Sequence, residues 1–244
     1  MCSVCWNWSD PSDPYTPQLT ILFNRDEQRS RAIATRPAIQ PIEGVQALMP
    51  IDPVRGGTWI STNEYGLTIA LLNNYAVLPT QGASYQSRGH IVLSLSSCRS
   101  IQEAVIMLKE LLGGALYPAF SLLIWEASQQ SVHFSQWDEQ QLSMPTLTQP
   151  FFTSSSWNTQ EVQEFRTRSY SEQVIAKSVP AKEFMAHTPE GKEMYSVFMA
   201  REKTQTVSIS EITVHGHQTN FSYFDRATGE TSQHCIPTQL TSAS

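Results

Sequence analysis

The first 24 residues carry the pattern that most limits how this chain can fold. Two runs rich in strand-forming residues, 2–8 and 19–24, flank residues 10–17, which include three prolines and two aspartates. Such a density of turn residues disfavours both strand and helix. The pattern therefore predicts an antiparallel hairpin with a long loop at the start of the chain.

The register of this hairpin brings the beginning of the chain next to a group of charged residues. If Trp8 pairs with Gln18 across the loop, Cys2 lies opposite Asn24, give or take two residues. The run Asn24-Arg25-Asp26-Glu27, here residues 24–27, follows an apolar strand directly. We therefore expect charged side chains beside Cys2, in the middle of a sheet.

Later segments predict further strands and a group of helices between them. Strand-forming runs occupy residues 57–61, 67–72, 120–126, 131–137, 206–214 and 220–225, and helical spacing occupies 100–112, 161–177 and, more weakly, 181–199. Strands near both ends, with helices in the middle, predict one α+β domain over residues 1–244. We expect residues 236–244 to form a loose tail.

Composition argues against several classes of protein. The net charge is −6 and there is no run of Lys or Arg, which disfavours nucleic-acid binding. No apolar stretch approaches the roughly 18 residues that a membrane span requires. The start lacks the features of a signal peptide, and the four cysteines lack the spacing of a secreted scaffold. We expect a cytoplasmic protein.

Cys2 is the first candidate for chemistry. We expect removal of Met1, after which Cys2 carries a thiol nucleophile and an α-amine whose pKa of about 7.7–8.0 suits a base at neutral pH. Attack by the thiol would form an acyl-enzyme that water then hydrolyses. The alternative is that Cys2 is simply a small residue in a first strand.

Arg25 and Asp26 are the candidates for helping Cys2. Arg25 would lower the pKa of the thiol or hold a substrate carboxylate, and Asp26 would anchor the terminal ammonium. Neighbours on a regular strand face opposite sides, so both reach Cys2 only if the strand ends or bulges there. The alternative is a solvated strand end.

Several motifs together resemble one known family. They are the opening Met1-Cys2, residues 24–27, Gly56-Gly57-Thr58-Trp59 and residues 203–208, and they resemble the NRDE family, also called the transport-and-Golgi-organisation family. That family is similar to the choloylglycine hydrolases and penicillin V acylases. The resemblance implies a four-layer αββα sandwich of two antiparallel sheets, with cleavage of amide bonds other than ordinary peptide links.

The same resemblance suggests roles for individual residues. Cys2 matches the nucleophile, Arg25 the arginine beside it, and Asn73, after the strand-forming run, an oxyanion-hole donor. Asp26 is a looser match, because the acylases place their aspartate three residues after the arginine. Ser154 stands where the acylases have a second catalytic asparagine.

The remaining candidates are contacts for a substrate. We expect Asn24, Trp59, Ser154 and Asn158 to contact it, although Asn158 also forms a reasonable N-cap pair with Glu161. We further expect Leu67–Asn73 to lie in the same sheet as Cys2, with the Asn73 amide aimed at the thiol. No metal site and no cofactor is expected.

Together these features predict a cysteine hydrolase of a small non-peptide amide or thioester, acting through an acyl-Cys2 intermediate. The alternative is a non-catalytic carrier of a hydrophobic metabolite such as haem or an acyl lipid. Either function makes a small molecule the expected partner, and a homo-oligomer is compatible with the sequence.

Overall fold

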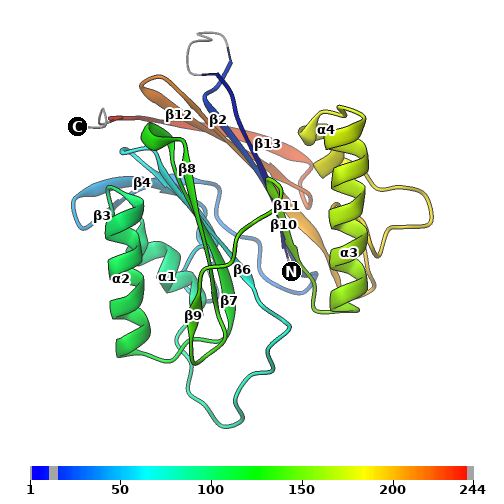
Figure 1. Ribbon diagram of the computed structural model, residues 1–244, viewed down its shortest axis with the longest axis horizontal. Helices are drawn as coiled ribbons and strands as arrows, with labels where there is room; N and C mark the ends of the chain where they lie inside the picture. Colours follow the sequence, from blue (N-terminus) through cyan, green and yellow to red (C-terminus); the bar gives the residue numbers. More distant parts are fainter. Residues whose placement is uncertain (1, 11–15, 241–244) are drawn as a thin grey trace.

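A computed structural model describes residues 2–10 and 16–240 of the chain. Two antiparallel sheets pack face to face, and helices cover the outer face of each (Figure 1). The predicted α+β fold with four αββα layers is therefore confirmed.

The first sheet joins the two ends of the chain. Its order is β10-β1-β2-β11-β12-β13, and every neighbouring pair is antiparallel. The strands are β1 (Cys2–Trp8), β2 (Leu19–Gln28), β10 (Phe151–Ser154), β11 (Thr204–His215), β12 (Gln218–Asp225) and β13 (Glu230–Pro237).

The second sheet follows chain order, as expected for successive hairpins. Its order is β3-β4-β5-β6-β7-β8-β9, again antiparallel throughout. The strands are β3 (Ala38–Ile42), β4 (Val45–Met49), β5 (Ile60–Asn63), β6 (Leu67–Asn73), β7 (Phe120–Glu126), β8 (Ser131–Trp137) and β9 (Leu142–Ser143).

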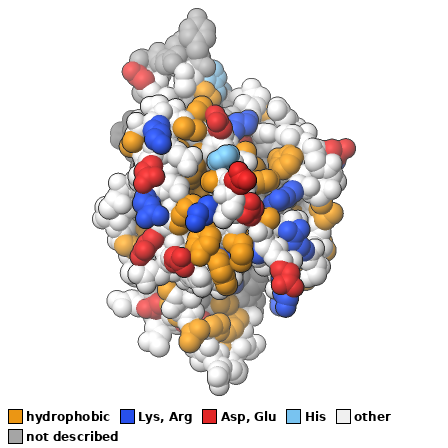
Figure 2. Space-filling view, turned by 90° about the vertical axis from the view of Figure 1, so that its right-hand side faces the viewer, with side chains coloured by type: hydrophobic (Ala, Val, Ile, Leu, Met, Phe, Trp, Pro, Cys, Tyr) orange, Lys and Arg blue, Asp and Glu red, His pale blue; other side chains and the backbone are white. Residues whose placement is uncertain are grey.

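The helices form the two outer layers. Helices α1 (Arg88–Leu95) and α2 (Ile101–Gly114) cover the second sheet, while α3 (Thr159–Tyr170), a π-helical turn η2 (Ser171–Ala176) and α4 (Ala181–Ala186) cover the first. A 3-10 turn, η1 (Ala127–Gln129), joins β7 to β8. Figure 2 shows the face on which α3 and α4 lie, with acidic and basic side chains interspersed over it. Among the residues described, no helix has the length and apolarity to cross a membrane.

Alternation along β2 sorts its side chains between two cores. Ile21 and Phe23 pack between the sheets, whereas Leu22 packs against the helices. Continuing this period of two residues, Arg25 falls on the inter-sheet face and Asp26 on the helix face. No bulge interrupts β2, since the register shift lies in β11 between Thr206 and Ser208.

The register prediction for the first hairpin is confirmed to within one residue. Cys2 pairs with Arg25 rather than Asn24, because the ladder begins at Trp8 and Leu19. The prediction that Leu67–Asn73 shares this sheet is wrong, since β6 belongs to the second sheet and packs across from β1.

Two other expectations need correction. Of residues 181–199, only Ala181–Ala186 is helical, and Pro189-Glu190-Gly191 lies in an irregular segment. The prediction of a loose tail is wrong for residues 236–238, because Ile236 is buried in β13 and the Thr238 N–H donates to the oxygen of His217. Residues 241–244 lie outside the described part of the chain.

Candidate active site

Cys2 lies where the two sheets diverge to form a cleft. It is the first residue of β1 and pairs with Ser154 of β10 on one side and Arg25 of β2 on the other. Its side chain is on the inter-sheet face with Val4 and is 7% exposed. The cleft beside it measures about 530 Å³.

Both sheets and the loops between them line this cleft. The first sheet contributes Cys2, Arg25, Asp26, Glu27 and Gln28; the second sheet contributes Leu71 and Asn73; the connecting segments and α1 contribute Arg31, Asp52, Arg55, Gly57, Thr58, Trp59, Tyr75, Tyr85, Gln86, Ser87, Arg88, Gly89 and Pro118. Of the predicted site residues, Cys2, Arg25, Asp26, Asn73 and Trp59 thus meet at one cleft.

The Gly-Gly-Thr-Trp segment brings the start of α1 to the cleft wall. A Cβ at Gly57 would lie 2.6 Å from the carbonyl carbon of Gly89, so only glycine allows this backbone contact. The Thr58 N–H also donates to the oxygen of Gly89, at 3.2 Å. This close approach holds the segment of Trp59 against the start of α1, and both Trp59 and Arg88 line the cleft.

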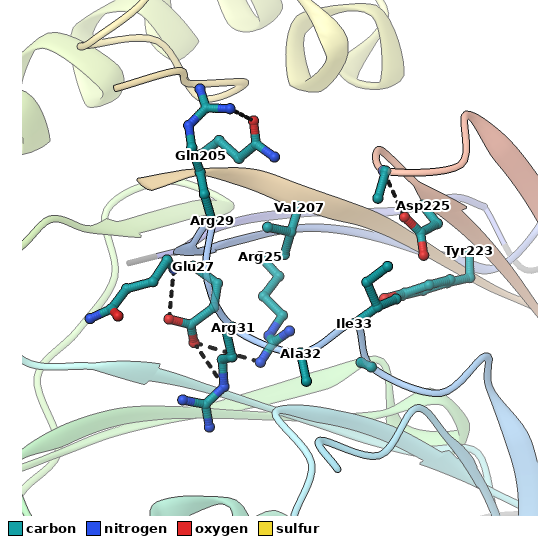
Figure 3. A pocket seen from close by; sticks show the side chains of 13 residues that line it. Arg25, Glu27, Arg29, Arg31, Ala32, Ile33, Gln205, Val207, Tyr223 and Asp225 are labelled. Atoms are coloured by element: carbon teal, nitrogen blue, oxygen red, sulfur yellow. Dashed lines mark hydrogen bonds and ion pairs between the residues drawn. The ribbon is translucent and has the colours of Figure 1, made fainter. Parts of the chain in front are cut away.

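Arg25 crosses from the first sheet to the loop before β5. Its Nη2 donates to Oδ2 of Asp52 at 2.9 Å and lies 3.6 Å from Oε2 of Glu27. Its guanidinium stacks on the Trp59 ring, 3.9 Å from the ring centre. Arg31 contacts the same two carboxylates, and Figure 3 shows Arg25 and Arg31 converging on Glu27.

This network keeps Asp52 ionised. Burial alone would raise the pKa of its carboxyl, but the hydrogen bond from Arg31, the backbone N–H of Val54 and the nearby guanidinium groups together hold the pKa below its usual value. Two arginines, Arg25 and Arg31, therefore share two carboxylates, and their charges are balanced inside the cleft.

Asp26 makes its side-chain contacts on the other face of β2. Its Oδ2 lies 3.3 Å from Nη2 of Arg166, and neither side chain is exposed. Its Oδ1 accepts a 2.7 Å hydrogen bond from Thr206. Arg166 also donates to the hydroxyls of Ser3 and Thr153, each at 3.1 Å. Asp26 nevertheless acts on the pKa of the Cys2 thiol, since its charge raises that pKa and a backbone hydrogen bond lowers it.

Arg166 is a residue that the sequence reasoning missed. In α3 the buried residues are Val162, Arg166 and Tyr170, spaced by four, so the arginine lies in the middle of the face that contacts the sheet. An arginine at i+4 between two apolar residues was the available signal, because a buried cation requires an anionic partner.

The pKa of the Cys2 thiol moves in the direction opposite to the one expected. Burial raises it above the ordinary value, and the charge of Asp26 adds to this. The charge of the chain's terminal amine, then the backbone hydrogen bond from Asp26 and the charge of Arg25 lower it, but they do not outweigh burial. Burial is the cause of the rise, and it applies to the chain that still carries Met1. The acidity of the thiol at a free N-terminus therefore stays a prediction.

Ser154 holds the backbone of Cys2. The Cys2 nitrogen donates to Oγ of Ser154 at 3.3 Å. Ser154 is buried at the end of β10, directly opposite Cys2 in the ladder. Its hydroxyl thus contacts the nitrogen that becomes the α-amine when Met1 is removed.

Asn73 faces this group from the second sheet. It ends β6, and its Nδ2 donates to the Tyr75 hydroxyl at 2.7 Å. An amide nitrogen has two N–H donors, so one remains for a ligand in the cleft. Asn73 reaches the cleft across the inter-sheet gap, not along the sheet that holds Cys2.

Of the four expected substrate contacts, Trp59 lines the cleft, Ser154 contacts the Cys2 nitrogen without lining it, and the other two make their contacts elsewhere. Asn24 is buried on the helix side, where its Nδ2 donates to the carbonyl oxygens of Met185 and Val197. Asn158 is exposed at the N-cap of α3, and its Nδ2 donates to Glu161 at 3.2 Å. Both positions correct the prediction, because neither residue lines the cleft.

Comparison with known proteins identifies the family. The family model described as Transport and Golgi organisation 2 matches residues 1–235. The chain belongs to this family. A search of curated proteins finds no significant match.

Several solved structures are similar to this chain in fold. Two are mutants of the conjugated bile acid hydrolase from Clostridium perfringens, each 12% identical, with TM-scores of 0.53 and 0.54. The alignments cover 98% and 100% of this chain and 98% and 99% of theirs. A Caenorhabditis elegans N-acylethanolamine-hydrolyzing acid amidase ortholog is 11% identical, with a TM-score of 0.49, over 87% of this chain and 92% of that one. The fold of this chain is that of the N-terminal-nucleophile hydrolases.

Proposed function

We propose that this protein is a cysteine hydrolase that cleaves a small non-peptide amide or thioester through an acyl-Cys2 intermediate. The observation that carries the proposal is the convergence of Cys2, Arg25 and Asn73 on one cleft, with the Cys2 nitrogen held by Ser154. The likeness in fold to a conjugated bile acid hydrolase supports hydrolysis as the reaction class.

The first half of the reaction forms the acyl-enzyme. With Met1 removed, the α-amine of Cys2 takes the thiol proton as sulfur attacks the substrate carbonyl. The negative oxygen accepts hydrogen bonds from the second N–H of Asn73 and from a backbone N–H. Collapse of this intermediate breaks the C–N or C–S bond, and the leaving amine or thiol takes the proton from the α-ammonium.

The second half releases the acid. Water loses a proton to the α-amine and attacks the acyl-Cys2 carbonyl. This attack forms a second tetrahedral intermediate, whose negatively charged oxygen accepts the same hydrogen bonds as in the first half. The C–S bond then breaks, and the thiolate recovers its proton. A thiol with the ordinary pKa of about 8.5 is mostly protonated at neutral pH, so the base must act in step with the attack.

Product release tests this proposal. The protein is incubated with octanoyl amides and octanoyl thioesters, and free octanoic acid is measured by mass spectrometry. Wild type should release acid from at least one member of the panel, and Cys2→Ala should reduce the rate by at least about a thousandfold. Equal release by wild type and Cys2→Ala would refute the proposal.

A carrier function is the second candidate, and the raised pKa of the thiol favours it. A carrier would bind an acyl ligand equally well with Cys2→Ala and would release no acid. The polar lining of the cleft, with four arginines and only a few apolar side chains such as Trp59 and Leu71, argues against a purely hydrophobic cargo.

A further inference from the structure

The cleft contains more positive charge than its own carboxylates neutralise. Arg25 and Arg31 are balanced by Asp52 and Glu27, as described above. The carboxylate of Asp26 is already paired with Arg166 on the helix side. The other two cleft arginines, Arg55 and Arg88, form no salt bridge with any described residue. The cleft is thus a positive site in a chain whose net charge is −6.

Arg88 is the better placed of these two arginines. It is half-buried at the first position of α1, whereas Arg55 is exposed. Its Nη1 donates to the oxygen of Ala119 at 2.8 Å, which fixes the direction of the side chain. A guanidinium has five N–H donors, so most of the fork remains available. Glu139 and Glu27 act on Arg88 only from beyond salt-bridge distance. A partly buried guanidinium held in one direction, with no described carboxylate in direct contact, fits an anionic ligand.

The surroundings of Arg88 place it on the nucleophile's cleft. Asn73, the expected oxyanion donor, and its partner Tyr75 line the same cleft as Arg88. Tyr75 and Cys2 are also among the groups whose charges act on Arg88. The close contact of Gly57 with Gly89 holds the first turn of α1 against this wall. A group bound to Arg88 would therefore belong to the same molecule as a carbonyl at Cys2.

We infer that Arg88 binds an anionic oxygen group, a carboxylate or a phosphate, on the substrate of Cys2. This inference rests on the proposed function and narrows its substrate class to acidic amides or thioesters. Trp59, Leu71 and Pro118 supply the apolar surface for the acyl part, and Arg88 supplies recognition of charge.

Binding to a variant without the nucleophile tests this inference apart from catalysis. In Cys2→Ala, calorimetry compares N-octanoylglycine and N-octanoyl-O-phosphoethanolamine with the neutral N-octanoylethanolamine. At least one anionic ligand should bind about tenfold more tightly than the neutral one. The two anionic arms show whether a carboxylate or a phosphate is preferred.

Substitution of Arg88 then assigns the preference. Arg88→Gln in the same background should reduce the ratio of affinities to about one, and Arg88→Lys should keep part of it. Arg168→Gln, on the exposed face of α3, is the matched control and should leave the ratio unchanged. Circular dichroism of each variant checks that the fold is retained.

Three results would overturn the inference. They are equal affinity for neutral and anionic ligands, no binding of any of the three, or a preference that survives Arg88→Gln and disappears in Arg55→Gln. Failure of the proposed function gives a different result. In that case wild type releases no acid, whereas the preference of Cys2→Ala for anionic ligands still depends on Arg88.

Discussion

Arg25 and Asp26 are neighbours on one strand, yet their charges are neutralised in two different surroundings. On the cleft side, Arg25 shares Asp52 and Glu27 with Arg31, and the side chains of this network are between 8% and 28% exposed. On the helix side, Asp26 pairs with Arg166 and both side chains are fully buried.

The difference in exposure determines how well each network tolerates the loss of one charged group. In the cleft, each charge has more than one partner and some contact with water, so the loss of one group leaves the others paired. Behind the strand, the loss of one partner leaves a charge without water or counter-ion. Because side chains alternate along β2, its charged motif has two parts with different tolerance to change: Arg25 on the cleft face and Asp26 on the helix face.

The largest effect is expected on the rigid side. Arg166→Met should reduce the free energy of unfolding by about 3–5 kcal/mol, because it leaves the Asp26 carboxylate buried and unpaired. Urea denaturation followed by circular dichroism measures this loss. Arg168→Met, two residues further along α3 and 68% exposed, should change stability by less than about 0.5 kcal/mol.

A double variant sharpens this first prediction. Asp26→Asn combined with Arg166→Met removes both charges. The double variant should therefore lose less free energy of unfolding than Arg166→Met alone. If the loss of free energy in the double variant equals the sum of the losses in the two single variants, Asp26 and Arg166 are not coupled. That result would contradict the prediction.

A smaller effect is expected on the cleft side. Arg25→Ala should reduce the free energy of unfolding by about 1–2 kcal/mol, because Arg31 still pairs with Asp52. It should also raise the pKa of the Cys2 thiol further and slow its alkylation by iodoacetamide at pH 8 several-fold. Labelling of the exposed Cys235 in the same sample is the internal reference. An unchanged labelling ratio would contradict the effect of the Arg25 charge on the pKa of the thiol.

The smallest effect concerns acid stability. The pKa of Asp52 is lowered in the folded protein, so its contribution is present above the unfolded value of about 3.9 and is lost as the pH falls through the folded value. Asp52→Asn should therefore flatten the loss of stability between about pH 5 and pH 3, by less than about 1 kcal/mol. Thermal unfolding at several pH values provides the curve, and parallel curves for both proteins would argue against the shift.

Much of the fold followed from the sequence because local patterns determine it. The Pro-rich loop and its flanking runs predicted the first hairpin, and the spacing of apolar residues predicted helix α2 after its N-cap at Ser100. Which sheet each hairpin joins could not be derived, since period-two alternation marks a buried face without naming the opposite layer. For this reason Leu67–Asn73 was assigned to the wrong sheet.

The candidate site was predictable where chemistry is carried by neighbours in sequence. Cys2, Arg25 and the Gly-Gly-Thr-Trp segment were found. Arg88 was missed because it is a single arginine at the first position of a helix, and Arg166 because it is a single arginine on the buried face of another. The raised pKa of Cys2 was missed for another reason: the balance between burial and nearby charge depends on depth, which the sequence does not give. The cytoplasmic location stays a prediction.

The central claim is that Cys2 becomes the first residue and forms a covalent bond to an acyl group. Intact-mass spectrometry of bacterially produced protein, treated with S-phenyl thiooctanoate and quenched in acid, tests it most directly. The account predicts the loss of one methionine and the gain of one octanoyl group, located by fragmentation on Cys2 and absent in Cys2→Ala. A retained Met1, or an octanoyl group that persists in Cys2→Ala, would contradict it.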